Sequence, residues 1–445
     1  MSETVSTILP PAVSPAIESD RARDATALDI AASRSRKPLA LAMGMLFLGA
    51  LPDGTIAPLL HDLFVERYGV SAAAAHWFMA VNLIGALLAL PLLARLRRVL
   101  PPSAMLAAAA ALSALFLAAM ALPIGFGWSL VLRIAEGAVD LAMLAILFDL
   151  LSKAGTQRTR GARFGVAGTV LLLGVACGVI IGGVIARFSP AFVFCFGAAA
   201  CLIVAAFALT RSAWFDGLVR SCPVVNDTGA IEAAPLRTLL WPALLMACTD
   251  RAVAGVVATT LLLYFAHVLD MAPAMRGGLL GGSILLLALG AWPAGLLADR
   301  VGHLRLRTLA AIVYAASIMA IPLIAATSVG QAWPFGLMIA MGCFGLSGAA
   351  LMPAGMALAC RSGRGSVAMG AYHAGGNIGY HLLGIGGAAA LLTLLSVAQP
   401  AMLIASPDAS FHPAAPMYHA VLFTFGAAHL IATIIAAVAL RGARS

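Results

Sequence analysis

Six charged residues interrupt long apolar stretches of the 445-residue sequence: Asp53, Arg133, Glu136, Asp140, Asp250 and Arg251. An ionised side chain in apolar surroundings is costly unless a partner compensates it. At 3.6 residues per helical turn, Arg133, Glu136, Gly137 and Asp140 fall within an arc of about 100° and therefore face one place. Asp250 and Arg251 are adjacent and cannot face each other on a helix, so at least one should have a partner on another element.

The chemistry that such a set can perform is proton binding. Four of the six residues are acids and two are arginines, so two negative charges stay uncompensated when all are ionised. Burial favours the neutral form of a carboxyl group, whereas a nearby arginine favours the ionised form. We therefore expect proton coupling at Asp53, Glu136, Asp140 and Asp250. Asp53 is the leading candidate because two prolines and a glycine beside it should loosen its helix. The alternative is structural, with Arg133 simply paired to Glu136 and Asp250 to a helix end.

A second polar stripe lies near the end of the chain, where His373, Asn377, Tyr380 and His381 recur at successive helical turns. We expect these four, together with Arg133 and Arg251, to line a substrate-binding wall. The histidines could also relay protons. No metal site is expected, because no cysteine or carboxylate set lies nearby. The alternative role is hydrogen bonding between helices.

The elements that position these residues must be membrane helices. Hydrophobic residues make up 62% of the chain and charged residues 10%, whereas a soluble domain has roughly 25% charged residues. Runs long enough to span a bilayer fall at 38–63, 73–94, 103–122, 128–151, 163–187, 191–210, 238–267, 275–298, 307–328, 334–360, 367–396 and 417–440. We predict an all-α polytopic membrane protein with twelve transmembrane helices.

The segments between the apolar runs predict the division into two bundles and the side of the membrane on which the termini lie. The longest internal polar stretch, 211–237, would be a cytoplasmic connector between six-helix bundles at 38–210 and 238–440, with cytoplasmic tails at 1–37 (disordered) and 441–445. Of the 27 lysines and arginines, 22 fall on one side, Arg305 and Arg307 among them, three on the other and two within spans. This asymmetry predicts cytoplasmic termini and a location in the inner membrane of the cell. Both halves have an aspartate in their first span and a glycine-rich fifth span, which indicates pseudo-symmetry.

The loop between the eighth and ninth runs reads Gly295-Leu296-Leu297-Ala298-Asp299-Arg300-Val301-Gly302-His303. It resembles the G-x-L-a-D-r-x-G-r signature of the major facilitator superfamily. The glycine would let a helix end pack closely, and Asp299 would accept charge-assisted hydrogen bonds from a neighbouring helix end. We expect Gly295, Asp299, Arg300 and Gly302 to act as a gating latch. The equivalent loop of the first half has Pro91 and Arg95 in place of the glycine and the aspartate.

Two further motifs lie in the fourth and fifth runs. Arg133 and Gly137 match the R-x-x-x-G of that superfamily, and Gly174, Gly178, Gly182 and Gly183 match a glycine repeat of its antiporters, with Val179 in place of the family's proline. Glycine repeats also serve plain helix packing, which is the role we assign to these four. The resemblance is closest to drug-efflux proton antiporters. It implies two six-helix bundles, alternating access and the proton as coupling ion, with no other cofactor.

These observations favour a proton-coupled secondary transporter that exports small organic molecules, such as a drug, a metabolite or a siderophore-like compound. We expect a monomer in the lipid bilayer that does not bind nucleic acid, because its basic residues are scattered. One alternative is proton-symport uptake of a siderophore or organic acid. A remote alternative is an intramembrane protease, because Gly345-Leu346-Ser347-Gly348 resembles the rhomboid G-x-S-G.

Overall fold

The computed structural model describes residues 39–96, 98–153, 160–213, 215–216, 240–327, 333–360, 365–405 and 412–442. Within these ranges every regular element is a helix. The predicted tail 1–37 and most of the predicted connector 211–237 lie outside the described residues.

The first six spans begin with a helix at 39–56 that continues through η1 (Ala57–Leu59) and the π-helical η2 (His61–Glu66). They continue with α2 (Ala72–Ala80) and α3 (Asn82–Leu96), α4 (Pro102–Ala121), α5 (Phe126–Lys153), α6 (Arg160–Ile185) and α7 (Phe192–Thr210).

The last six spans begin with α9 (Leu240–Val256), the π-helical η4 (Val257–Leu261) and α10 (Leu262–His267). They continue with α11 (Pro273–Val301), α12 (His303–Thr327), α13 (Trp333–Cys360), α14 (Gly365–Asn377) with the π-helical η5 (Ile378–Gly386) and α15 (Gly387–Ala405), and α16 (Ala415–Gly442).

Eleven of these segments are helices long and apolar enough to cross a membrane. The twelfth long helix is α5, which has 28 residues and carries Arg133, Glu136 and Asp140 in its interior. The predicted all-α fold with twelve spans is thereby confirmed. Two boundaries differ from the prediction. The eleventh span continues as α15 to Ala405, and the predicted connector begins packed on the bundle, where the Ser103 backbone and hydroxyl donate hydrogen bonds to Asp216 at 3.1 and 2.9 Å.

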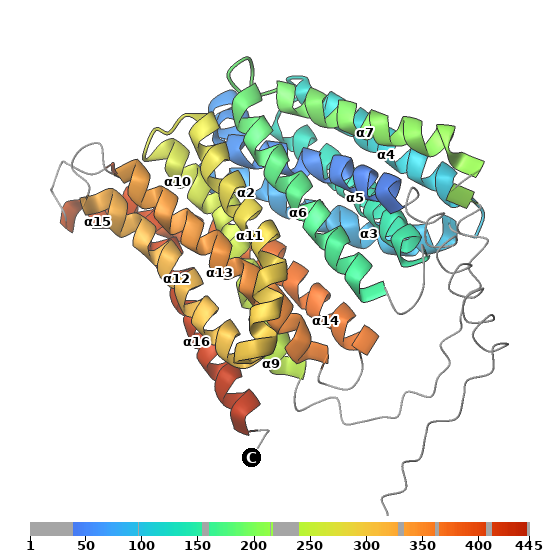
Figure 1. The fold of residues 1–445 in the computed structure, drawn as a ribbon. Helices are drawn as coiled ribbons and strands as arrows, with labels where there is room; N and C mark the ends of the chain where they lie inside the picture. Colours follow the sequence, from blue (N-terminus) through green and yellow to red (C-terminus); the bar gives the residue numbers. More distant parts are fainter. Residues whose placement is uncertain are drawn as a thin grey trace, which may run out of the picture.

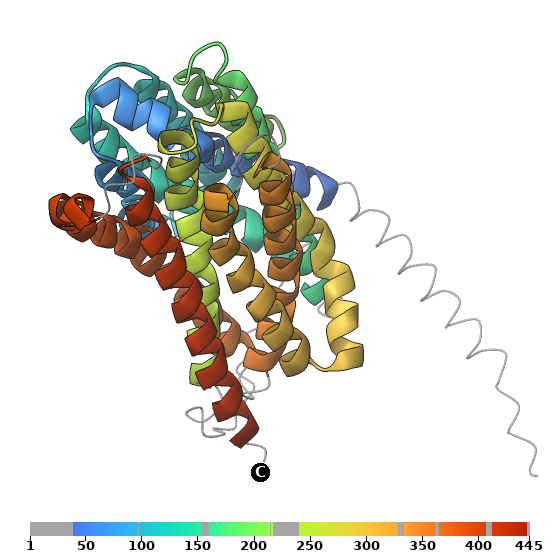
Figure 2. The ribbon, with the colours of Figure 1, turned by 90° about the vertical axis from the view of Figure 1, so that its left-hand side faces the viewer.

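The helices form two sets, the first six spans and the last six. In the first set α4 packs against α5 and α7, and α3 against α5; in the second, α13 packs against α11 and α12, and α9 against η5, α14 and α16. Figure 1 shows the two sets as separate groups in blue to green and in yellow to red. Figure 2 shows α16, in red, running beside the yellow-green α9 toward the C-terminus.

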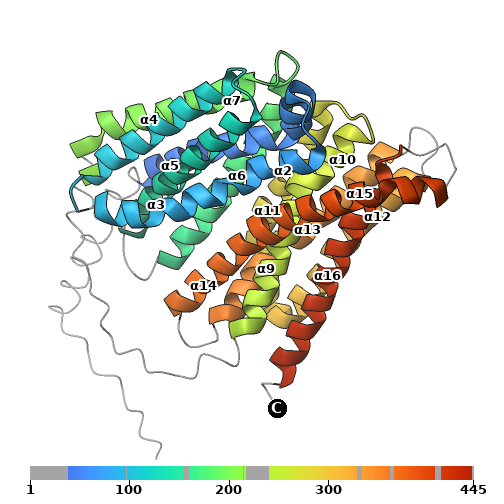
Figure 3. The ribbon, with the colours of Figure 1, turned by 180° about the vertical axis from the view of Figure 1, so that it is seen from behind.

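The two sets approach each other at one end and spread apart at the other. Figures 1 and 3 show them close together near α2 and α10, and diverging toward α14 and the C-terminus. Contacts between the sets join η1 to η4, η2 to α10, and α2 to η4, η5 and α15, while α6 packs along α11. We call the first region the closed end and the opposite region the spread end. At the closed end, residues of both sets, such as Phe64, Phe78, Leu261 and Phe265, share one buried apolar cluster.

Candidate functional site

Arg133 is the centre of a buried ion cluster in the first set. Its side chain, 1% exposed, donates to Asp53 Oδ1 at 2.7 Å and to Glu136 Oε2 at 2.5 Å. The Ser113 hydroxyl donates to the other oxygen of Glu136 at 3.1 Å. The predicted partner of Arg133 three residues along the helix is therefore present, and Asp53 joins it from the first span.

The acids of this cluster differ in their access to solvent. The side chain of Glu136 is 2% exposed, whereas that of Asp53 is 34% exposed. Asp140 is buried, and the described residues give it no hydrogen-bond or ion-pair partner. Three carboxyl groups thus accompany one guanidinium group, which leaves this part of the site short of positive charge when all are ionised.

In the second set, Asp250 does not belong to that cluster. Arg307 donates to Asp250 Oδ2 at 2.8 Å, and His429 Nδ1 lies 3.6 Å from Oδ1. Arg307 and His429 are both fully buried. The sequence places Arg307 among the basic residues at the cytoplasmic start of the ninth run, 307–328. In the structure the helix begins four residues earlier, at His303, because the turn between α11 and α12 is Gly302 alone, with φ of +96°, so Arg307 lies one turn inside α12. The balance predicted from sequence, four acids against two arginines, therefore omitted the buried arginine that pairs with Asp250.

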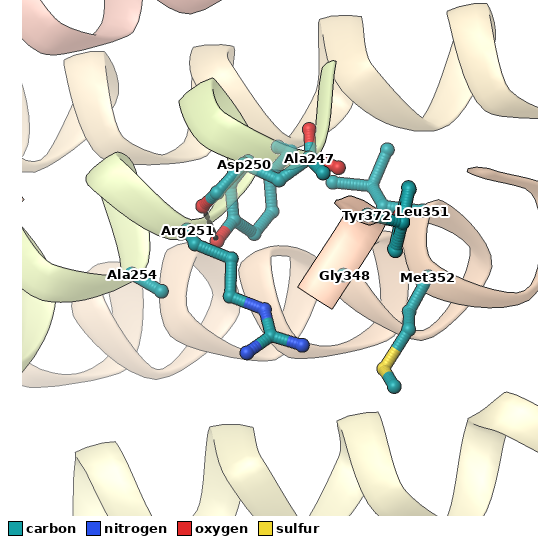
Figure 4. A pocket seen from close by; sticks show the side chains of 9 residues that line it. Ala247, Asp250, Arg251, Ala254, Gly348, Leu351, Met352 and Tyr372 are labelled. Atoms are coloured by element: carbon teal, nitrogen blue, oxygen red, sulfur yellow. Dashed lines mark hydrogen bonds between the residues drawn. The ribbon is translucent and has the colours of Figure 1, made fainter. Parts of the chain in front are cut away.

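Arg251, next to Asp250, points elsewhere. It contacts Asn377 Oδ1 at 3.3 Å and His373 Nδ1 at 3.4 Å. Figure 4 shows its guanidinium group extending away from Asp250 at a small cavity lined by Tyr314, Leu351, Met352 and Tyr372 among others. Asp250 and Arg251 therefore both have partners on other helices, whereas the sequence predicted such a partner for at least one of them.

The remaining members of the polar stripe lie in the π-helical turn η5 of the eleventh span. Tyr380 lies where η5 packs against α9 of its own set and α2 of the first set. His381 lies against the backbone of Met79 in α2, and its buried Nδ1 has no hydrogen-bond partner among the residues that the structure describes. A π-helical turn has more residues per turn than an α-helix, so the stripe divides: His373 and Asn377 meet Arg251, and His381 meets the first set.

The four glycines of α6 lie at close helix contacts. A Cβ atom at Gly174, Gly178 or Gly182 would collide with backbone of the first span, at Phe47, Leu51 and Thr55 respectively. A Cβ atom at Gly183 would collide with Pro273 at the start of α11. The repeat thus packs α6 against a helix of its own set and, at one end, against the other set.

The predicted latch is not engaged in this arrangement. Asp299 has an exposed side chain that lies 3.3 Å from His303 of the next helix and meets no residue of the first set within the described ranges, and Arg300 is exposed. The close packing expected at Gly295 is wrong here, since nothing lies within 4 Å of a Cβ atom built there. Gly302, in contrast, has a backbone conformation that favours glycine. The gating role of this loop stays a prediction for a state in which the spread end closes.

The closed end holds an ion pair that the sequence did not indicate. Arg276 of α11 donates to both oxygens of Asp62 in η2, at 3.0 and 2.8 Å, with side-chain exposures of 3% and 13%. Nearby, His76 Nε2 lies 2.8 Å from the Thr260 hydroxyl, again joining the two sets. Arg276 lies at the start of the eighth apolar run, 275–298, and only the fold shows that it faces an acid 214 residues away.

The protease alternative does not fit the geometry of Ser347. Its hydroxyl donates to the carbonyls of Cys343 and Phe344 in its own helix, at 2.6 and 3.1 Å. Among the described residues, the histidines of the eleventh span contact Arg251 and α2 instead. Ser347 therefore has no base beside it to activate it as a nucleophile.

Comparisons with known proteins agree with this geometry. Residues 42–218 match the family model of the Major Facilitator Superfamily. The comparison with curated proteins found no match. A bacterial homolog to the human lysosomal transporter Spinster, solved in an inward-facing and unoccupied conformation, is similar in structure, with 12% identity, a TM-score of 0.65, and coverage of 91% of this chain and 96% of that one.

Two other solved structures are similar to the same extent. The tetrameric PepTSo2 has 14% identity and a TM-score of 0.67, over 92% of this chain and 99% of that one. The nucleoside transporter NupG has 13% identity and a TM-score of 0.66, over 90% and 99%. The chain is thus a multi-pass membrane protein with the fold of major facilitator superfamily transporters, and its residues 42–218 also match that family in sequence.

Proposed function

We propose that this protein is a secondary transporter that moves small organic molecules across the membrane by alternating access, coupled to protons. The observation that carries the proposal is the cluster of Asp53, Glu136 and Asp140 around the single guanidinium group of Arg133. Ionisable groups within membrane spans are costly and usually serve transport or proton relay. An enzyme is not proposed, because the family match and the fold both belong to transporters.

The three acids would have different roles. Glu136 is fixed by Arg133 and Ser113 and hidden from solvent, so it would hold Arg133 in place. Asp53 is the accessible member of the cluster and would exchange the proton. A cationic substrate group and a proton would compete for Asp53 and Asp140, since either one supplies the missing positive charge. Such competition exchanges protons for substrate and supports export.

The distribution of basic residues supports an orientation. The lysines and arginines concentrate on the side of the termini, so we assign the spread end to the cytoplasm. In this orientation the described arrangement would receive substrate from the cytoplasm and would be closed to the outside by the pair of Asp62 and Arg276. Closure of the spread end would bring the loop with Asp299 toward the first set.

Proton-symport uptake of an organic acid or siderophore remains the second candidate. One observation favours it: Arg251 has no carboxylate partner in the described part of the chain and could meet an anionic group. Arg133, which was expected to share that role, is already neutralised by Asp53 and Glu136.

The test is transport by the purified chain in proteoliposomes with an imposed pH gradient, using labelled cationic drugs, organic acids and siderophores. Movement of a compound against the direction of proton flow supports export, and movement with it supports symport. The variant Asp53→Asn should lose gradient-driven transport, while Glu66→Gln, an exposed acid outside the cluster, should keep it. Transport by the wild type that is independent of the gradient would disprove proton coupling.

A further inference from the structure

We infer that the substrate is amphoteric, with a cationic group that meets the acids of the first set and an anionic group that meets Arg251. This inference rests on the proposed transport function and narrows its substrate class. It depends on how charge is distributed between the two sets of helices.

The first set offers negative charge. Asp53, Glu136 and Asp140 share one arginine, and the Asp53 side chain is 34% exposed although it pairs with Arg133. Asp140 has no cationic partner within the described ranges. A substrate ammonium group would therefore find carboxylate oxygens that the protein leaves partly uncompensated.

The second set offers positive charge at Arg251. Each buried arginine of the described chain, Arg133, Arg276 and Arg307, has a carboxylate at 2.7 or 2.8 Å. Arg251 is half-buried, and within the described ranges it has two long contacts, to the side chains of Asn377 and His373. A guanidinium group has five N–H donors in a planar fork that suits a carboxylate, so the remaining donors of Arg251 are suited to an anionic ligand.

Both charges act on one place. The segment η5, which contains Tyr380, packs against α9, which carries Arg251, and against α2 of the first set. The Arg133 guanidinium group lies 5.5 Å from the centre of the Phe78 ring in α2. A ligand along η5 would therefore have its cationic end toward the first set and its anionic end toward the second. A ligand with only one charge would leave one side of the site uncompensated. The competing explanation is that Arg251 pairs with an acid of the first set when the spread end closes, and the experiment below separates the two.

The experiment measures binding to the purified full-length chain. The probes are norfloxacin and 4-(aminomethyl)benzoic acid, each as the amphoteric compound, the N-acetyl derivative, which is only anionic, and the methyl ester, which is only cationic. For at least one of the two parent compounds, the amphoteric form should bind at least about tenfold more tightly than either blocked form. The inference would be overturned if a blocked form bound more tightly for both parent compounds, or if neither amphoteric form bound.

Substitutions of Arg251 test whether this residue binds the anionic group of the ligand. Arg251→Gln should weaken binding of the amphoteric and N-acetyl forms by about 10- to 100-fold, as expected for loss of a charge-assisted bidentate contact, and should leave binding of the ester unchanged. Arg251→Lys should restore part of the loss. Arg211→Gln, an exposed arginine after α7, is the matched control. Equal weakening of all three forms by Arg251→Gln would mean that Arg251 pairs within the protein, and the inference would fail.

Transport assays distinguish this inference from the proposed function. Gradient-driven movement of singly charged compounds only, with amphoteric compounds excluded, would keep the transporter and overturn the inference. Tight, Arg251-dependent binding of an amphoteric probe without any transport would support the recognition and overturn the function.

Discussion

The ion pair between Asp62 and Arg276 should hold the closed end shut, and Asp62→Asn should weaken it. Both side chains are largely buried, and the pair joins the two sets. When the closed end opens, both groups gain water, so the variant loses stability mainly in the closed state.

The size of the effect follows from burial. Breaking a buried ion pair by removing one charge costs about 3 to 5 kcal/mol. Asparagine keeps one acceptor oxygen, and Asp62 is 13% exposed, so we expect the lower limit, about 3 kcal/mol. This corresponds to a change on the order of 100-fold in the equilibrium between closed and open forms.

Labelling of a reporter cysteine measures this equilibrium. Val257 is 1% exposed in η4, which packs against η1 of the other set. In a chain whose seven natural cysteines are replaced, Val257→Cys should react slowly with a membrane-impermeant maleimide added outside. Asp62→Asn should raise that rate by up to about 100-fold.

A matched control and a charge reversal complete the experiment. Glu66→Gln makes the same chemical change one turn away, on a side chain that is 61% exposed, and should leave the rate unchanged. Exchange of the two charges, Asp62→Arg with Arg276→Asp, should restore protection. If Asp62→Asn leaves the reporter as protected as in the parent chain, the pair does not hold the closed end.

Three further outcomes are expected. Arg307→Met leaves Asp250 buried without its cation and should destabilise the protein by about 3 to 5 kcal/mol, seen as a lower denaturation midpoint in detergent; an unchanged midpoint would contradict this. Gly182→Ala places a methyl group against backbone of the first span and should cost about 1 to 3 kcal/mol, whereas Gly168→Ala, on the same helix with open space beside it, should be neutral or stabilising. Asp53→Asn should abolish gradient-driven transport while exchange of labelled for unlabelled substrate persists; retained accumulation would assign the proton to another acid.

The sequence predicted the features that depend on the spacing of residues along a single helix. The twelve spans follow from apolar runs, and the shared face of Arg133 and Glu136 follows from helical spacing alone. The α6 glycines could be assigned to packing because close helix contacts need small residues, and the structure places backbone against each of the four.

Pairings between helices were outside the reach of a single sequence. Arg307 follows Arg305 by two residues in a basic segment that is typical of a membrane surface. The one-residue turn at Gly302 instead places Arg307 inside the helix. His429 lies within the last apolar run, 417–440; a buried histidine there needs a polar partner, but the sequence does not say which one. The pair of Asp62 and Arg276 has no sequence pattern, because its members lie on helices that meet only in the folded chain.

Asp250 and Arg251 are consecutive residues of α9 that border the same cavity, and their side chains point in different directions. Asp250 is tied through Arg307 to α12 and lies beside His429 of α16, while Arg251 faces the cavity. A ligand that binds Arg251 therefore contacts a helix that is joined to α12 and lies beside α16 one residue away, at Asp250. A displacement of α9 at Arg251 would therefore separate Asp250 from Arg307 unless α12 moved with α9.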